Sequence, residues 1–69
     1  MSRPRRKAVL AILQVDGTDD NVKLIADLQE GLENDHDTPA HVQLLATAEK
    51  LGVGMNKLTN AMGTIARIQ

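Results

Sequence analysis

The stretch AEKLGVGMNKLTNAMG, residues 48–63, decides the fold of this chain. Gly52 is expected to end one helix, because glycine adopts the left-handed backbone conformation without steric cost from a Cβ atom. Leu58 and Ala61 then return at helical spacing, so a second helix is expected to begin directly after the turn. The stretch therefore predicts two helices that meet at a tight corner, with the small Ala48 where they cross.

Helical spacing of apolar residues extends towards the N-terminus. Residues 18–34 carry one apolar stripe, formed by Val22, Ile25, Leu28 and Leu32. Thr18 suits the N-cap of this helix, and two aspartates follow it in the first turn, where the helix dipole favours negative charge. A third helix is expected over residues 39–51, capped by Asp37 or Thr38 and with the proline that follows them in its first turn.

The first segment of the chain is less sharply defined. Residues 7–15 lack strict alternation of apolar and polar side chains, so the pattern favours a helix over a short strand, and a strand stays an alternative. The arginines before Lys7 oppose the dipole at a helix N-terminus, so we expect the helix to begin near Lys7. Asp16 and Gly17 are typical of a turn and are expected to stop it.

Length and composition point to one small all-α domain. The 69 residues include no Phe, Tyr or Trp, so the core must be built from aliphatic side chains that each bury little area. We predict a compact bundle of three or four short helices, with a basic N-terminal arm at residues 1–7 and a single helical domain at residues 8–69. Such a monomer is expected to be marginally stable, which favours a homodimer.

The net charge of −1 conceals a strong asymmetry along the chain. The N-terminal arm is purely basic, with Arg3, Arg5, Arg6 and Lys7. Residues 16–37 contain eight acidic residues against Lys23 alone. We interpret the acidic run as the solvated face of the helix over residues 18–33.

The sequence gives no sign of several functional classes, and we expect the protein to belong to none of them. The chain has no cysteine, and His36 and His41 are five residues apart, which is not the spacing of ligands on one helix face, so we expect no metal site and no cofactor. No phosphate-binding loop and no paired nucleophile and base are present, so we expect no enzyme activity. No segment has the length of a transmembrane helix, and we expect a cytoplasmic protein that does not contact membranes.

The run TAEKLGVGMNKLTNAM, residues 47–62, resembles the helix-turn-helix of Cro-like phage repressors in its pattern A-x-x-L-G-V-x-x-x-x-L-x-x-A. The resemblance implies binding to double-stranded DNA and regulation of transcription, with the second helix starting near Gly54 and entering the major groove. Its outward residues would be Met55 and the four candidate contacts Asn56, Lys57, Thr59 and Asn60. The basic arm would add contacts to phosphates or the minor groove through Arg3, Arg5, Arg6 and Lys7.

Other interpretations stay open. The segment from residue 52 to 62 is also similar to the G-x-N-L-N-Q-[IL]-A segment of small plasmid mobilisation accessory proteins, with Asn56 and Leu58 matching and Gly54 and Lys57 departing. A plain helix–glycine–helix corner has the same pattern. In another class, the chain would be a homodimeric protein-interaction module or inhibitor, whose acidic helix 18–33 meets a basic protein partner and which binds no DNA.

Overall fold

The computed structural model describes residues 2–34 and 36–68, and the described part of the chain consists of four α-helices without a strand. They are α1 (Arg3–Ile12), α2 (Asp19–Asn34), α3 (Ala40–Leu51) and α4 (Met55–Arg67). The predicted all-α fold is confirmed. The alternative of a strand in residues 7–15 is wrong, because α1 runs through Ile12 and only its turn follows.

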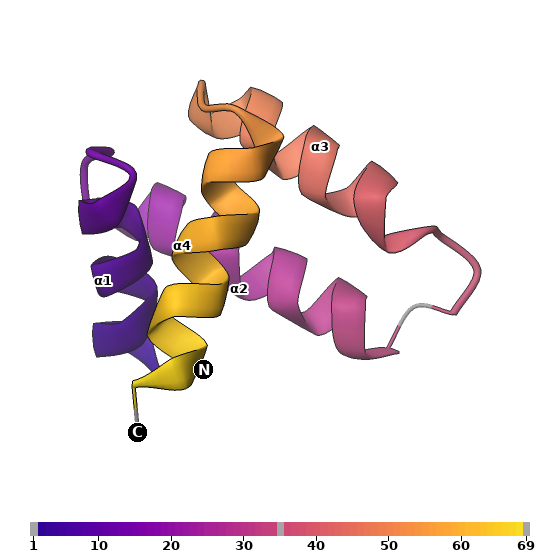
Figure 1. Ribbon diagram of the computed structural model, residues 1–69, viewed down its shortest axis with the longest axis horizontal. Helices are drawn as coiled ribbons and strands as arrows, with labels where there is room; N and C mark the ends of the chain where they lie inside the picture. The colour runs from indigo at the N-terminus through magenta and orange to yellow at the C-terminus, as the bar shows by residue number, and fades with distance from the viewer. Residues whose placement is uncertain (1, 35, 69) are drawn as a thin grey trace.

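The helices form two pairs that cross each other (Figure 1). α2 and α3 run antiparallel as a hairpin, and α4 lies beside α1 and runs in the opposite direction. Each helix packs against its neighbour in the chain, and α4 closes the arrangement by packing against α1. The domain measures 29 × 26 × 21 Å along its principal axes.

The core lies between the two helix pairs and is entirely aliphatic. α2 contributes the predicted stripe except for Leu32, which is 36% exposed near the end of the helix. α4 contributes Leu58, Ala61 and Ile65, in agreement with the helical spacing that predicts it. The buried core residues are Val9, Leu10, Leu13, Val22, Ile25, Leu28, Ala48, Leu58, Ala61 and Ile65.

α1 begins at Arg3, four residues before the predicted start near Lys7. Residues 3–7 are therefore the first turns of α1 rather than a separate arm, and residue 1 lies outside the described residues. Pro4 suits this position, because the first turn of a helix leaves its backbone N–H groups unpaired in any case. The Arg3 guanidinium pairs with Asp19 of α2, which offsets the unfavourable dipole.

The helix ends differ from the predictions in two more places. α1 stops before Gly17, and the left-handed residue that ends it is Gln14, with φ of 58°. The Val15 N–H donates to the Leu10 carbonyl over 2.9 Å, which closes the turn. In α3 the N-cap position belongs to Pro39 rather than to Asp37 or Thr38, and the Pro39 carbonyl accepts the first backbone hydrogen bonds.

The predicted cap of α2 is confirmed. The backbone N–H of Asn21 donates to the Thr18 hydroxyl over 3.3 Å, and the N–H of Val22 donates to the Thr18 carbonyl over 2.9 Å. The Asn21 side chain donates to the carbonyl of Asp16, which holds the connection from α1 against the start of α2. Local hydrogen bonds therefore fix where α2 begins.

Replacing Leu58 with Ala should destabilise the fold by about 2–5 kcal/mol, because this fully buried side chain joins α4 to the rest of the core. A loss of that size approaches the whole stability of about 3–5 kcal/mol that such a small core supplies. Urea unfolding followed by far-UV circular dichroism measures it. Ile12→Ala, at a position 49% exposed, is the matched control and should change stability by less than about 0.5 kcal/mol.

Candidate nucleic-acid interface

The corner between α3 and α4 is closed by backbone hydrogen bonds around a left-handed glycine. Gly52 has φ of 75°, as its position in the sequence predicts. Its N–H donates to the Glu49 carbonyl, and the Val53 N–H reaches back to the Ala48 carbonyl over 3.0 Å. Gly54 then occupies the N-cap of α4 in an extended conformation. This is the Schellman arrangement, and it turns the chain sharply without leaving the last carbonyls of α3 unpaired.

The residues expected to hold the two helices together are buried. Ala48 is 1% exposed, Leu58 is fully buried and Ala61 is 1% exposed. Leu51 and Val53 are half-buried and pack against the same core. Thr47 is also buried, a position that the apolar pattern did not identify because threonine is polar. The corner between α3 and α4 is therefore packed on the core through a small alanine and several apolar side chains.

α4 presents a polar face on its far side. Asn56, Lys57, Thr59 and Asn60 are all exposed. The Thr59 hydroxyl donates to the Met55 carbonyl over 3.0 Å, so this side chain lies against its own helix. Met55 is half-buried against the core rather than outward, because it falls on the side of α4 that packs. Three of the four predicted contacts on α4 are therefore free to reach a ligand.

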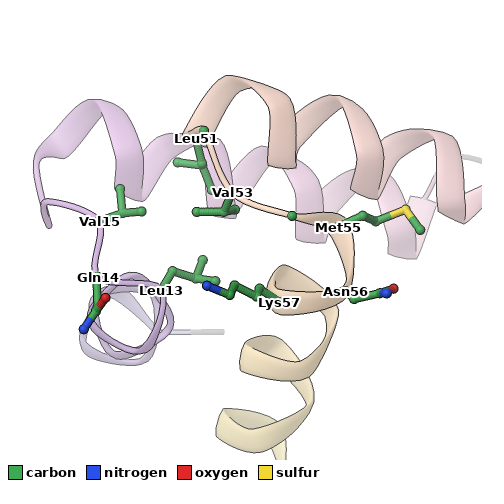
Figure 2. A pocket seen from close by; sticks show the side chains of 10 residues that line it. Leu13, Gln14, Val15, Leu51, Val53, Met55, Asn56 and Lys57 are labelled. Carbon is green, nitrogen blue, oxygen red and sulfur yellow. The ribbon is translucent and has the colours of Figure 1, made fainter.

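Asn56 and Lys57 leave the helix in different directions (Figure 2). Lys57 extends towards the turn after α1, into a hollow lined mainly by Leu13, Val15, Leu51 and Val53. Asn56 points to the other side of α4. Asn60 lines a second hollow together with Lys57, Leu13 and Gln14, whereas helical spacing puts Arg67 on the same face as Asn56. Arg67 is exposed and was missed by sequence reasoning, although its spacing from Asn56 could have identified it.

Arg5 of α1 lies at the opposite end of α4 from Asn56 and Lys57. Arg5 and Pro4 line a small hollow with Ile65 and Ile68, at the C-terminal end of α4. α4 has 13 residues and is thus about 20 Å long. The predicted arm and the predicted reading residues therefore belong to one pair of helices but not to one compact site.

Charge is sorted between the two helix pairs. α1 and α4 together carry Arg3, Arg5, Arg6, Lys7, Lys57 and Arg67, and neither helix contains an acidic residue. α2 carries five acidic residues against Lys23, and these acids are exposed. The α1–α4 pair is therefore the part of the molecule that attracts a polyanion, and α2 repels it.

Two of the basic side chains have distinct surroundings. The Arg3 guanidinium donates a hydrogen bond to Asp19, and that bond together with the positive charge lowers the pKa of the Asp19 carboxyl, with a smaller effect from Lys7. The positive charge of Arg3 is thus partly neutralised. The Nε atom of Arg6 is buried without a hydrogen-bond partner in the described structure. Arg6 stands three and four residues before the buried Val9 and Leu10, so it lies on the same face of α1 as these core residues.

No protein-family model matches the chain, and the comparisons with curated proteins and with solved structures found no significant match. Within residues 2–34 and 36–68, no helix combines the length and apolar character needed to cross a membrane. The same described residues contain no group of three His, Asp or Glu side chains that could hold a metal ion.

Replacing Arg3 with Ala should raise the pKa of Asp19 towards its ordinary value of 3.8, because the hydrogen bond and the positive charge are both lost. A carboxyl with a lowered folded-state pKa stabilises the fold above its unfolded pKa and loses that contribution as pH falls through the folded pKa. The wild type should therefore exceed the variant in stability at neutral pH and lose this advantage in acid. Carboxyl carbon NMR titration measures the pKa, and Lys50→Ala, on α3, should leave it unchanged.

Replacing Gly52 with Ala should cost about 1–2 kcal/mol, because a Cβ atom disfavours the left-handed conformation even though open space surrounds it. Gly63→Ala is the matched control, since Gly63 lies inside α4 and its added Cβ also meets no atom within 4 Å. That change should stabilise α4 by about 0.5–1 kcal/mol. Urea unfolding measures the free energy of unfolding of both variants. If both substitutions changed it in the same direction, the role of Gly52 would be contradicted.

Proposed function

We propose that the chain is a small DNA-binding regulator of transcription that acts as a homodimer in the cytoplasm without enzyme activity. Its α3–Gly52–α4 corner acts as the helix-turn-helix, and α4 enters the major groove of double-stranded DNA. The proposal rests on one observation: the corner closed by Gly52 is followed by a helix, α4, whose exposed polar face contains no acid. An acid on that face would be repelled by phosphate.

The charge sorting also supports DNA as the ligand. A protein with its acids distributed evenly would meet repulsion wherever it approached the duplex. Here α1 and α4 contain no acid and the nearest acid, Asp19 of α2, is paired with Arg3 at the start of α1, so α4 can approach phosphates. The basic residues in the first turns of α1 extend this positive surface to the C-terminal end of α4.

Different side chains have different roles in this proposal. Asn56 and Asn60 lie one turn apart on α4, are both exposed and can each pair with adenine through the amide group. Lys57 extends sideways along the domain and contacts a phosphate rather than a base. Arg5 and Arg67 add phosphate contacts at the C-terminal end of α4.

Fluorescence anisotropy with a labelled duplex tests these roles, first with a random-sequence pool and then with the sequence that the protein enriches from it. Lys57→Ala should weaken binding to both DNAs alike and lower the slope of log affinity against log salt by about 0.9. Asn60→Ala should weaken binding to the enriched sequence by about 1–3 kcal/mol and leave binding to the pool nearly unchanged.

Lys23→Ala is the control for the loss of one positive charge, because Lys23 is exposed on the acidic α2. It should leave affinity and its salt dependence nearly unchanged. Unchanged binding in both α4 variants would rule out α4 as the reading helix. An absence of duplex binding at low salt would instead favour a protein-interaction module, in which the exposed acids of α2 meet a basic protein partner.

A further inference from the structure

A hollow of about 630 Å³ lies between the turn after α1 and the start of α4 (Figure 2). Its volume falls within the range of about 300–1,000 Å³ that is typical of sites for small molecules. Leu13 and Val15 from the turn after α1, and Leu51 and Val53 from the α3–α4 corner, give part of its wall an aliphatic surface. The hollow therefore has the size and the apolar contacts that a small organic molecule requires.

Two glycines keep one side of this hollow open. Gly52 and Gly54 both line it, and a Cβ atom added at either position would meet no other atom within 4 Å. The left-handed turn requires Gly52, but Gly54 has φ of −72° and ψ of 145°, which any residue can adopt. Ser, Thr, Asp or Asn would cap α4 better at this position. The backbone does not require a glycine at position 54, and the effect of that glycine is an accessible hollow.

The charge of the hollow comes from one side chain. Among the described residues that line it, only Lys57 is ionisable, so no acid of the lining can pair with its ammonium group. The Lys57 side chain extends from the first turn of α4 towards Leu13 and Gln14 (Figure 2), and these three residues also line the adjoining hollow. A single positive charge beside aliphatic side chains is complementary to a molecule that combines one negative charge with an apolar body.

We propose that this hollow binds a small organic acid with an apolar body and a single carboxylate. The body lies against Leu13, Val15 and Val53, and the carboxylate accepts a charge-assisted hydrogen bond from the Lys57 ammonium group. A phosphate monoester carries up to two negative charges, and the hollow supplies one cation. A neutral apolar molecule leaves Lys57 unused. The lining therefore favours a monocarboxylate over both.

The bound acid competes with DNA for Lys57, and this part of the proposal rests on the proposed function. The carboxylate occupies the ammonium group that would otherwise contact a phosphate, and it adds a negative charge at the start of α4. The acid is therefore an effector that weakens DNA binding. Its binding to the hollow requires no DNA, so the two parts can be tested separately.

Titration of the isotope-labelled chain with hexanoate, followed by amide NMR in the absence of DNA, tests the site. Hexanoate should shift the amide signals of residues 13–15 and 51–57 with a dissociation constant on the order of 1 mM. 1-Hexanol has the same chain length without the charge and should bind about fivefold more weakly. Acetate has the charge without the apolar body and should cause no such shifts.

Two substitutions separate the ligand site from the fold. Lys57→Met keeps an unbranched side chain and removes its charge, so hexanoate should bind this variant no better than 1-hexanol does. Gly54→Asp places a carboxylate on the lining of the hollow and should abolish hexanoate binding. Aspartate caps a helix better than glycine, so urea unfolding should show no loss of stability in this variant. Lys23→Met, on α2, is the matched control and should bind hexanoate as the wild type does.

Three outcomes would overturn the site: no amide shifts with hexanoate, equal affinities of the wild type for hexanoate and 1-hexanol, or unchanged hexanoate binding in Gly54→Asp. Hexanoate binding that depends on Lys57 and on an open Gly54 would establish it.

Fluorescence anisotropy with a labelled duplex tests the competition, in hexanoate and in acetate at the same ionic strength. Hexanoate should weaken duplex binding by the wild type and have no such effect on Lys57→Met. Duplex binding that hexanoate leaves unchanged in the wild type would overturn the competition and keep the proposed function. Hexanoate binding by a chain that binds no duplex would establish the site and overturn the proposed function.

Discussion

The left-handed turn at Gly52 is the constraint on which the rest of the domain depends. It turns the chain sharply after α3 and directs α4 across the α2–α3 hairpin and along α1. Leu58, Ala61 and Ile65 thereby complete a core that the first three helices leave open. The core contains no aromatic side chain, so no large ring can fill a gap that a misplaced α4 would leave. Local backbone geometry and the packing of the whole chain are therefore tied to one residue.

Much of this fold follows from the sequence, because its signals are local. The apolar spacing of α2 and α4, the Thr18 cap and the Gly52 stop all act within a few residues, and each predicts what the structure contains. The early start of α1 depends on Asp19, sixteen residues away from Arg3, and no local pattern contains that contact. The sequence predicts that the first helix stops at Gly17, but the left-handed residue at its end is Gln14, because the packing of Leu13 and Val15 fixes the turn there.

The candidate site is predictable in composition but not in arrangement. Helical spacing correctly predicts that Asn56, Lys57, Thr59 and Asn60 are exposed. It does not predict that Lys57 extends towards the turn after α1, or that Arg5 of α1 lies beside the other end of α4. Those facts depend on how α1 and α4 pack against each other, and packing joins residues that are far apart in the sequence.

The separation of charge between the helix pairs has a consequence before any contact is made. Cations predominate on α1 and α4 and acids on α2, so charge is unevenly distributed over the domain despite a net charge of only −1. In the field of a polyanion such a molecule experiences a torque that turns its positive end forward while it diffuses. The attraction on the positive part of the domain and the repulsion on its negative part nearly cancel in the net force, but both turn the domain in the same direction. The chain can therefore be oriented by a charged surface that scarcely draws it closer.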